Sequence, residues 1–185
     1  MLRILLVLLT IYNVNGQIRC LLSTYVNNVG LTKELSGTYY VIYTSATVLD
    51  CEQNTWTIGI DNTLSVDIQS TGCCMQIQNF DSSNKTQFSY TIVSPTASGC
   101  ALSSTEKTTM KIIKQINFGG DTCLIIYICR PSRQGLLVLC RNRNQPNTLL
   151  GFINALLTTL LGLLFVPELR KVNQIGCLGS STCIL

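Results

Sequence analysis

The residues that could carry chemistry in this chain are ten cysteines, and no histidine accompanies them. Without an imidazole, the usual Ser-His-Asp and Cys-His catalytic sites, His-ligated haem sites and His-containing zinc sites are excluded. No C-x-x-C spacing occurs, so the cysteines do not form a zinc or redox motif. A thiol enzyme would need a free, activated cysteine, whereas an even number favours pairing. We therefore expect no enzyme, no metal site and no cofactor.

So many cysteines at low charge indicate disulfides formed in an oxidising compartment. Residues 1–16 agree with this, because they read as a secretory signal peptide. Arg3 gives a positive start, 4–11 form an apolar core, and small residues precede a cleavage point at Gln17. We expect residues 17–185 to form one secreted, extracellular domain that contains all ten cysteines.

Charge and glycosylation motifs narrow the class of partner. The net charge is only +4, and no basic run is longer than Arg170-Lys171, which argues against nucleic-acid binding. Asn84-Lys85-Thr86 is the only permitted N-glycosylation motif after residue 16 and lies in a polar stretch. We expect a glycosylated surface loop at Asn84.

Short runs of β-branched, aromatic and aliphatic residues alternate with Asn, Ser, Gly and Pro clusters from residue 35 to 142, as in an antiparallel meander. The pattern predicts strands at 37–45, 55–60, 64–70, 74–80, 88–93, 101–104, 108–117, 123–130 and 136–141. Eight or nine strands with short connections, such as 131–135, suit an up-and-down barrel or a sandwich. The barrel is favoured because a helix, and not more strands, follows.

That helix is predicted at 149–166 and is unusually apolar. No charge occurs between Arg143 and Glu168, and leucines surround the helix axis. Such a helix is covered on all sides or lies in a membrane. A membrane-anchored or lipid-particle-associated protein is therefore the alternative, although a spanning helix would leave Cys177 and Cys183 in the reducing cytosol.

Several motifs agree in order and spacing with one family. They are Leu-Ser-Gly-Thr-Tyr-Tyr-Val-Ile at 35–42, Tyr127-Ile128-Cys129, Arg141-Asn142 and Val-Asn-Gln-Ile-Gly-Cys at 172–177. With them the chain resembles the lipocalins, specifically the apolipoprotein D and bilin-binding group. The resemblance implies an all-β fold: an eight-stranded antiparallel up-and-down β-barrel (calyx) with one C-terminal α-helix packed on the outside. Tyr39 replaces the family's Trp, and the Thr-Asp-Tyr motif is replaced near 118–120.

The resemblance also implies two disulfides, Cys20 with Cys129 and Cys51 with Cys177. Each closes a loop of over 100 residues, so each contributes about 4 to 5 kcal/mol in the chain-entropy model.

The other six cysteines are not ordered by the resemblance. Cys123 and Cys140 are expected to pair, because they would lie on adjacent antiparallel strands with side chains on the same outer face. The pairing of Cys73, Cys74, Cys100 and Cys183 stays open.

The family stacks its Trp on an Arg at the closed end of the barrel, which implies a structural cation–π contact between Tyr39 and Arg141 here. Because strand side chains alternate, counting in twos from these anchors predicts inward positions along their strands. These predicted ligand-binding residues are Val41, Tyr43, Leu137 and Leu139. Similar alternation without an anchor adds Trp56, Ile58, Phe88, Tyr90 and Ile92.

A wall of this composition predicts a secreted carrier of a small hydrophobic ligand, such as a fatty acid, sterol, retinoid or pigment. The alternative is that these side chains simply fill the barrel. In the family the turn between the last two strands lies at the open mouth, which implies that Arg130 and Arg133 lie near a ligand carboxylate. A solvated turn is the alternative there. The ligand's identity and the oligomeric state do not follow from the sequence.

Overall fold

The computed structural model describes residues 30, 32–46, 48, 50–60, 63–71, 73–79, 87–95, 108–130, 133–161 and 168–177. Within these ranges, the side chains of 78–95, 108, 130, 133–134 and 161 are not described. Several expectations therefore lie outside the described residues: the signal peptide 1–16, the strand 101–104, the glycosylation motif at Asn84, and Cys20, Cys100 and Cys183.

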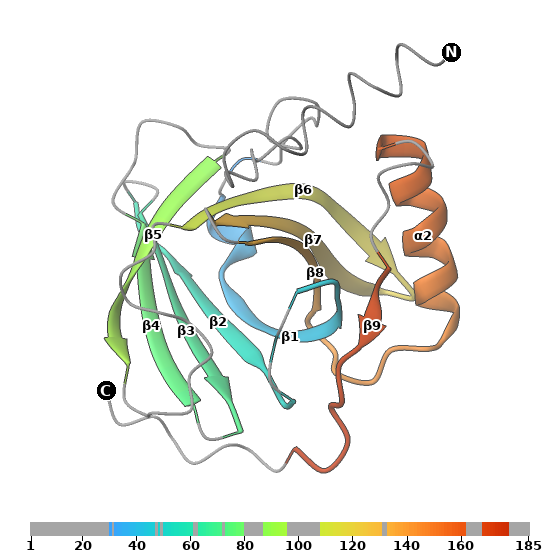
Figure 1. Cartoon of the computed structure of the whole chain (residues 1–185), viewed down its shortest axis with the longest axis horizontal. Coiled ribbons are helices and arrows are strands. Elements are labelled where there is room, and N and C mark those ends of the chain that lie inside the picture. The colour runs from blue at the N-terminus through green and yellow to red at the C-terminus, as the bar shows by residue number, and fades with distance from the viewer. Residues whose placement is uncertain are drawn as a thin grey trace.

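The described chain is built almost entirely from antiparallel strands, one after another (Figure 1). A short 3-10 helix, η2 (Lys33–Leu35), precedes the first strand. The strands are β1 (Gly37–Thr44), β2 (Gln53–Ile58), β3 (Leu64–Ser70), β4 (Cys73–Asn79), β5 (Gln87–Pro95), β6 (Thr108–Phe118), β7 (Asp121–Arg130) and β8 (Arg133–Cys140). The helix α2 (Thr148–Leu161) and the two-residue strand β9 (Arg170–Lys171) follow.

The eight long strands pair in a ring. Each strand pairs with the next one along the chain, and β1 pairs with β8 as well as with β2. The order is therefore that of an up-and-down barrel, and the alternative of a sandwich is wrong. We call the end where β1 begins and β8 ends the closed end, and the opposite end the far end. The connections β1–β2, β3–β4 and β7–β8 lie at the far end.

The predicted strand bounds agree with the structure where apolar and polar residues alternate clearly in the sequence. The range 64–70 is found as predicted in β3, whereas β2 begins and ends two residues earlier than the predicted 55–60. The turn between β7 and β8 is shorter than the predicted connection 131–135, because β8 already begins at Arg133.

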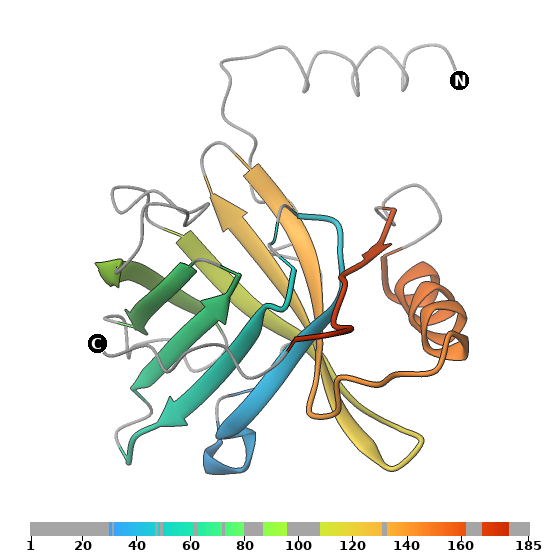
Figure 2. The same cartoon turned by 90° about the horizontal axis from the view of Figure 1, so that it is seen from below.

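Buried side chains divide into two groups on the two faces of the ring. The interior cluster takes alternate residues from β1, β2, β3, β4, β6, β7 and β8, so it occupies the face that these strands share. The outer cluster joins the other face of β1, β6, β7 and β8 to Leu149, Ile153 and Leu157 of α2. Figures 1 and 2 both show α2 lying against this side of the barrel.

A β-bulge in β1 changes which of its residues face inward. Val41 pairs with Leu139, but Tyr43 pairs with Val138, so one extra residue lies between them in β1. Ile42 and Tyr43 therefore both belong to the outer cluster. The expectation that Tyr43 faces the interior is wrong, because counting in twos fails across a bulge.

The helix α2 is apolar all round in sequence but is one-sided in the structure. Leu149, Ile153 and Leu157, spaced by four residues, are fully buried against the barrel. Phe152 and Leu160 are 43% and 38% exposed, and the Phe152 ring lies at the edge of this contact, with its centroid 5.4 Å from that of Phe118 in β6. The predicted range 149–166 extends past the described end of this helix at Leu161. None of the described helices combines the length and the apolar character needed to cross a membrane.

The segment after α2 fills the place where β1 and β2 separate. Strand β9 pairs with Tyr43 and Thr44 of β1. The Gln174 side chain donates hydrogen bonds to the carbonyl oxygens of Val41 and Glu52, at 2.9 and 3.1 Å. These bonds reinforce the link between β1 and the start of β2, where the Val41 amide also donates directly to the Glu52 carbonyl oxygen at 3.0 Å.

The structure contains two disulfides that the sequence led us to expect. Cys51 is bonded to Cys177, which ties the C-terminal segment to the β1–β2 connection. Cys123 is bonded to Cys140 across the β7–β8 pair, on the outer face. Cys73, Cys74 and Cys129 are also disulfide-bonded. The pairing of Cys129 with Cys20 stays a prediction.

Gly135 in β8 lies where the chain leaving β1 crosses over it. A Cβ added at Gly135 would lie 2.7 Å from the Cβ of Ala46 and 3.2 Å from its backbone nitrogen. Gly135→Ala should therefore lower the free energy of unfolding by about 1 to 3 kcal/mol, as overpacking does. Urea unfolding of the disulfide-intact protein measures this.

Gly151 provides the matched control, because a Cβ there meets nothing within 4 Å. Gly151→Ala should raise stability by up to about 1 kcal/mol, the difference in helix propensity between the two residues. Equal stability of Gly135→Ala and the unchanged protein would contradict the crossing described above.

Candidate functional site

The closed end of the barrel is held by Tyr39 and Arg141. The guanidinium carbon of Arg141 lies 5.3 Å from the centroid of the Tyr39 ring, so the expected cation–π contact is present. The Tyr39 hydroxyl donates a hydrogen bond to the carbonyl oxygen of Leu35 at 3.1 Å and accepts one from Arg141 Nη2 at 3.3 Å. Arg141 Nη2 also donates to the carbonyl oxygen of Glu34 at 2.7 Å. These contacts fix η2 across the end of the barrel.

Gly37 makes this arrangement possible. Its φ of +135° is one that L side chains rarely adopt, and the position of its absent Cβ lies 3.8 Å from the Arg141 guanidinium. Because of this φ, a side chain at 37 would be strained, although its Cβ would make only ordinary van der Waals contact with the cation.

The interior cluster forms the wall of the candidate site. Of the predicted inward residues, the structure places Val41, Trp56, Ile58, Leu137 and Leu139 in this cluster. Trp56 lies near the closed end, where its ring centroid is 5.8 Å from that of Tyr39 at an interplanar angle of 59°. Tyr43 is excluded from the wall by the bulge and belongs to the outer cluster instead.

The remaining predicted residues are placed by their backbone alone. Phe88 pairs with Met110 and Ile92 with Ile77, both members of the interior cluster, whereas Tyr90 pairs with Thr108. Arg130 and Arg133 pair with each other across the β7–β8 turn at the far end. The side chains of all five predicted residues lie outside the description.

The sequence predictions missed most of the interior residues on strands where no motif residue fixes which positions face inward. The additional interior residues on these strands are Leu64, Val66, Ile68, Cys73, Met75, Ile77, Met110, Ile112, Leu124 and Ile126. The alternation in β3 alone would have revealed three of them, because Leu, Val and Ile occupy every second position there.

The described interior is apolar with a few neutral polar groups and no buried charge. Thr44, Asn54 and Ser70 are buried, and each is paired by backbone register with an interior residue. Thr44 is satisfied locally, since its hydroxyl accepts a hydrogen bond from the Ala46 backbone at 2.8 Å. A site of this kind selects lipophilic molecules and disfavours ions, because a buried unpaired charge is costly.

Comparison with other proteins supports the fold. No protein-family model and no curated protein matches the sequence. The structure is similar to apocrustacyanin C2, with 9% identity and a TM-score of 0.52, over 77% of this chain and 78% of that one. It is also similar to lobster apocrustacyanin A1, with 11% identity and a TM-score of 0.50, over 75% and 77% of the two chains. The fold is lipocalin-like. At these identities the likeness establishes the fold alone.

Two buried titratable groups of the lipocalin-like barrel lie on its outer face. Burial raises the pKa of the Tyr43 phenol and lowers the pKa of the Lys111 ammonium group. Lys111 pairs with Tyr127 of the outer cluster, so its charge does not face the interior. Neither group contributes to the candidate site.

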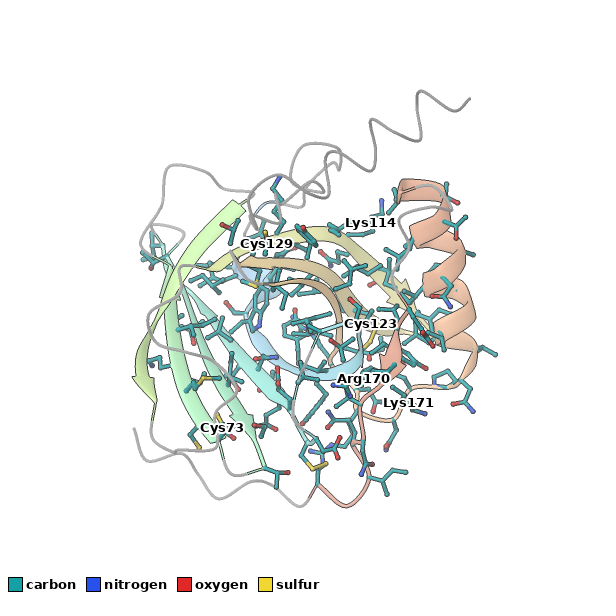
Figure 3. All side chains as sticks on the ribbon, in the orientation of Figure 1. Cys73, Lys114, Cys123, Cys129, Arg170 and Lys171 are labelled. Atoms are coloured by element: carbon teal, nitrogen blue, oxygen red, sulfur yellow. A yellow bond between two sulfur atoms is a disulfide. The ribbon has the colours of Figure 1, made fainter. Side chains whose placement is uncertain are left out.

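One group of potential metal ligands occurs in the described residues, and its chemistry argues against a metal. Asp121, Cys123 and Cys140 have ligand atoms within 4.8 Å of one another. Because the two sulfur atoms are bonded to each other, neither is a thiolate. Figure 3 shows Cys123 on the side of the barrel that faces α2.

The closed-end contacts predict that even the conservative substitution Arg141→Lys lowers the free energy of unfolding. Arg141→Lys keeps the charge but loses the planar guanidinium that reaches both the ring and the carbonyl oxygens. We expect the free energy of unfolding to fall by about 1 kcal/mol, measured by urea unfolding. Tyr39→Phe, which keeps the ring and loses only the hydroxyl, should cost a similar amount. If neither variant differed from the unchanged protein, the closed-end contacts would carry no net stability.

Proposed function

We propose that this protein is a secreted carrier that binds one small lipophilic molecule inside the barrel. The observation that carries the proposal is the composition of the interior cluster, whose members are all hydrophobic and come mainly from seven strands of the ring. An eight-stranded barrel is wide enough to hold one small ligand. Each 100 Å² of apolar ligand surface removed from water favours binding by about 2.5 kcal/mol.

The likeness to apocrustacyanins supports this proposal through the fold they share with the chain. The bonded state of every described cysteine supports secretion, because such disulfides persist in oxidising compartments. The carrier function requires no catalytic group, which suits a chain without histidine.

Filling the interior should weaken binding. Ile68 lies in the interior cluster near the far end of β3, and a phenyl ring there would occupy space that a ligand needs. We expect Ile68→Phe to bind the neutral fluorescent probe N-phenyl-1-naphthylamine about tenfold more weakly, since overpacking costs about 1.4 kcal/mol. Fluorescence titration measures the dissociation constants.

Ser65 provides the control on the same strand. It lies on the opposite face of β3 and is half-buried, so Ser65→Phe adds the same ring outside the barrel. That variant should bind as the unchanged protein does. If the unchanged protein showed no saturable binding, or if both variants lost affinity equally, the interior site would be rejected.

The paired arginines at the far end predict a preference for anionic ligands. Arg130 and Arg133 are opposite one another in the last turn of the barrel, where two cations would attract a carboxylate at the rim. Changing both to Ala should weaken palmitate binding about threefold, the scale of exposed ion pairs, and leave cholesterol binding unchanged. Displacement of the fluorescent probe at low salt measures both.

Lys114→Ala tests whether net charge alone matters, because Lys114 is an exposed cation on β6. This change should leave the palmitate affinity as it is. Equal losses for palmitate and cholesterol in the double variant would show that these arginines do not act on a carboxylate.

A further inference from the structure

Trp56 leaves a hydrogen-bond donor unused inside the barrel. Its side chain is only 2% exposed, and its indole Nε1 has no hydrogen-bond acceptor among the described residues. Buried polar groups are nearly always paired, and an unpaired one costs free energy. An indole N–H donates and cannot accept, so whatever satisfies it must supply an acceptor atom.

The groups that the structure shows next to Trp56 are already engaged in other contacts. The Tyr39 hydroxyl, whose ring lies beside Trp56, donates to Leu35 and accepts from Arg141. The backbone of β2 around Trp56 is paired on both sides, with Gly37 of β1 and Val66 of β3. The free donor thus belongs to the interior near the closed end and is not needed to hold the strands together.

We propose that Trp56 recognises the inner end of the ligand by donating a hydrogen bond to a neutral oxygen atom, as in a ketone or aldehyde. This proposal rests on the proposed carrier function and names the chemistry of its ligand. The acceptor is neutral because the buried interior side chains of the described chain include no cation that would compensate an anion. An anionic group, where a ligand has one, lies at the far end with Arg130 and Arg133.

The chain offers a direct measurement of this hydrogen bond. Trp56 is the only tryptophan, so the ¹⁵N-labelled protein has one indole N–H resonance. Two probes of nearly equal shape are compared, 2-undecanone and 2-methyl-1-undecene, which carries a methylidene group in place of the carbonyl oxygen. Both are neutral, so the arginines at the far end do not distinguish them.

The ketone is expected to bind about five- to tenfold more tightly than the alkene, the range for one buried hydrogen bond. It should also move the indole proton downfield, whereas the alkene should not. In Trp56→Phe, which keeps an aromatic ring without the donor, the two probes should bind about equally. Tyr39→Phe is the matched control, because it removes a hydroxyl from the neighbouring ring and should preserve the preference for the ketone.

The outcomes separate this proposal from the carrier function. If both probes displace N-phenyl-1-naphthylamine with equal affinity and shift the indole proton alike, the carrier function holds and the role of Trp56 is overturned. The same conclusion follows if the indole proton shows a cross-peak to a bound water molecule that persists in the ketone complex. If neither probe displaces the dye, the interior site itself fails and this proposal fails with it. The measurements on the unchanged protein decide the matter even if Trp56→Phe does not fold.

Discussion

The double pairing of β1 is the constraint on which the rest of the structure depends. Its first half pairs with β2 and its second half pairs with β8, so the sheet has no free edge between these strands. Closure gives every strand one face toward the interior of the barrel and one face toward the outside. The interior cluster and the outer cluster follow directly, and so does the position of α2, which can cover only the outer face.

The bulge in β1 places an additional side chain of this strand on the outer face, where α2 packs. A strand without a bulge would present every second residue to α2, but the extra residue places both Ile42 and Tyr43 on the outer face. The same extra residue breaks the regular ladder, and Ile42 uses its carbonyl oxygen to accept a hydrogen bond from the Val172 backbone at 2.9 Å. The segment that follows α2 is thereby fixed to β1, next to the bridge from Cys51 to Cys177.

Sequence reasoning succeeded where local patterns and ordered motifs agreed. The bounds of β3, the bridge of Cys51 to Cys177 and the contact of Tyr39 with Arg141 all rest on residues that carry their own signal. Tyr43 was misplaced because a bulge is set by pairing with a distant strand and leaves no local mark in the sequence. The buried face of α2 was also hidden, since a helix with leucines on every side has no preferred face until a barrel covers one of them. That the indole N–H of Trp56 has no acceptor within the described part of the chain can be recognised only once the pairing of β2 with β1 and β3 is known.

Several sources of stability in this fold lie outside the interior, and this bears on function. The bridge from Cys51 to Cys177 joins residues 126 apart in sequence, and loops of that size contribute about 4 to 5 kcal/mol in the chain-entropy model. Arg141 fixes the closed end through backbone carbonyl oxygens, and the outer cluster adds a second set of buried side chains under α2. A barrel stabilised in these ways does not need every interior contact to be optimal. It therefore tolerates an unsatisfied indole N–H at Trp56, which a protein stabilised only by its core would be expected to pair or replace.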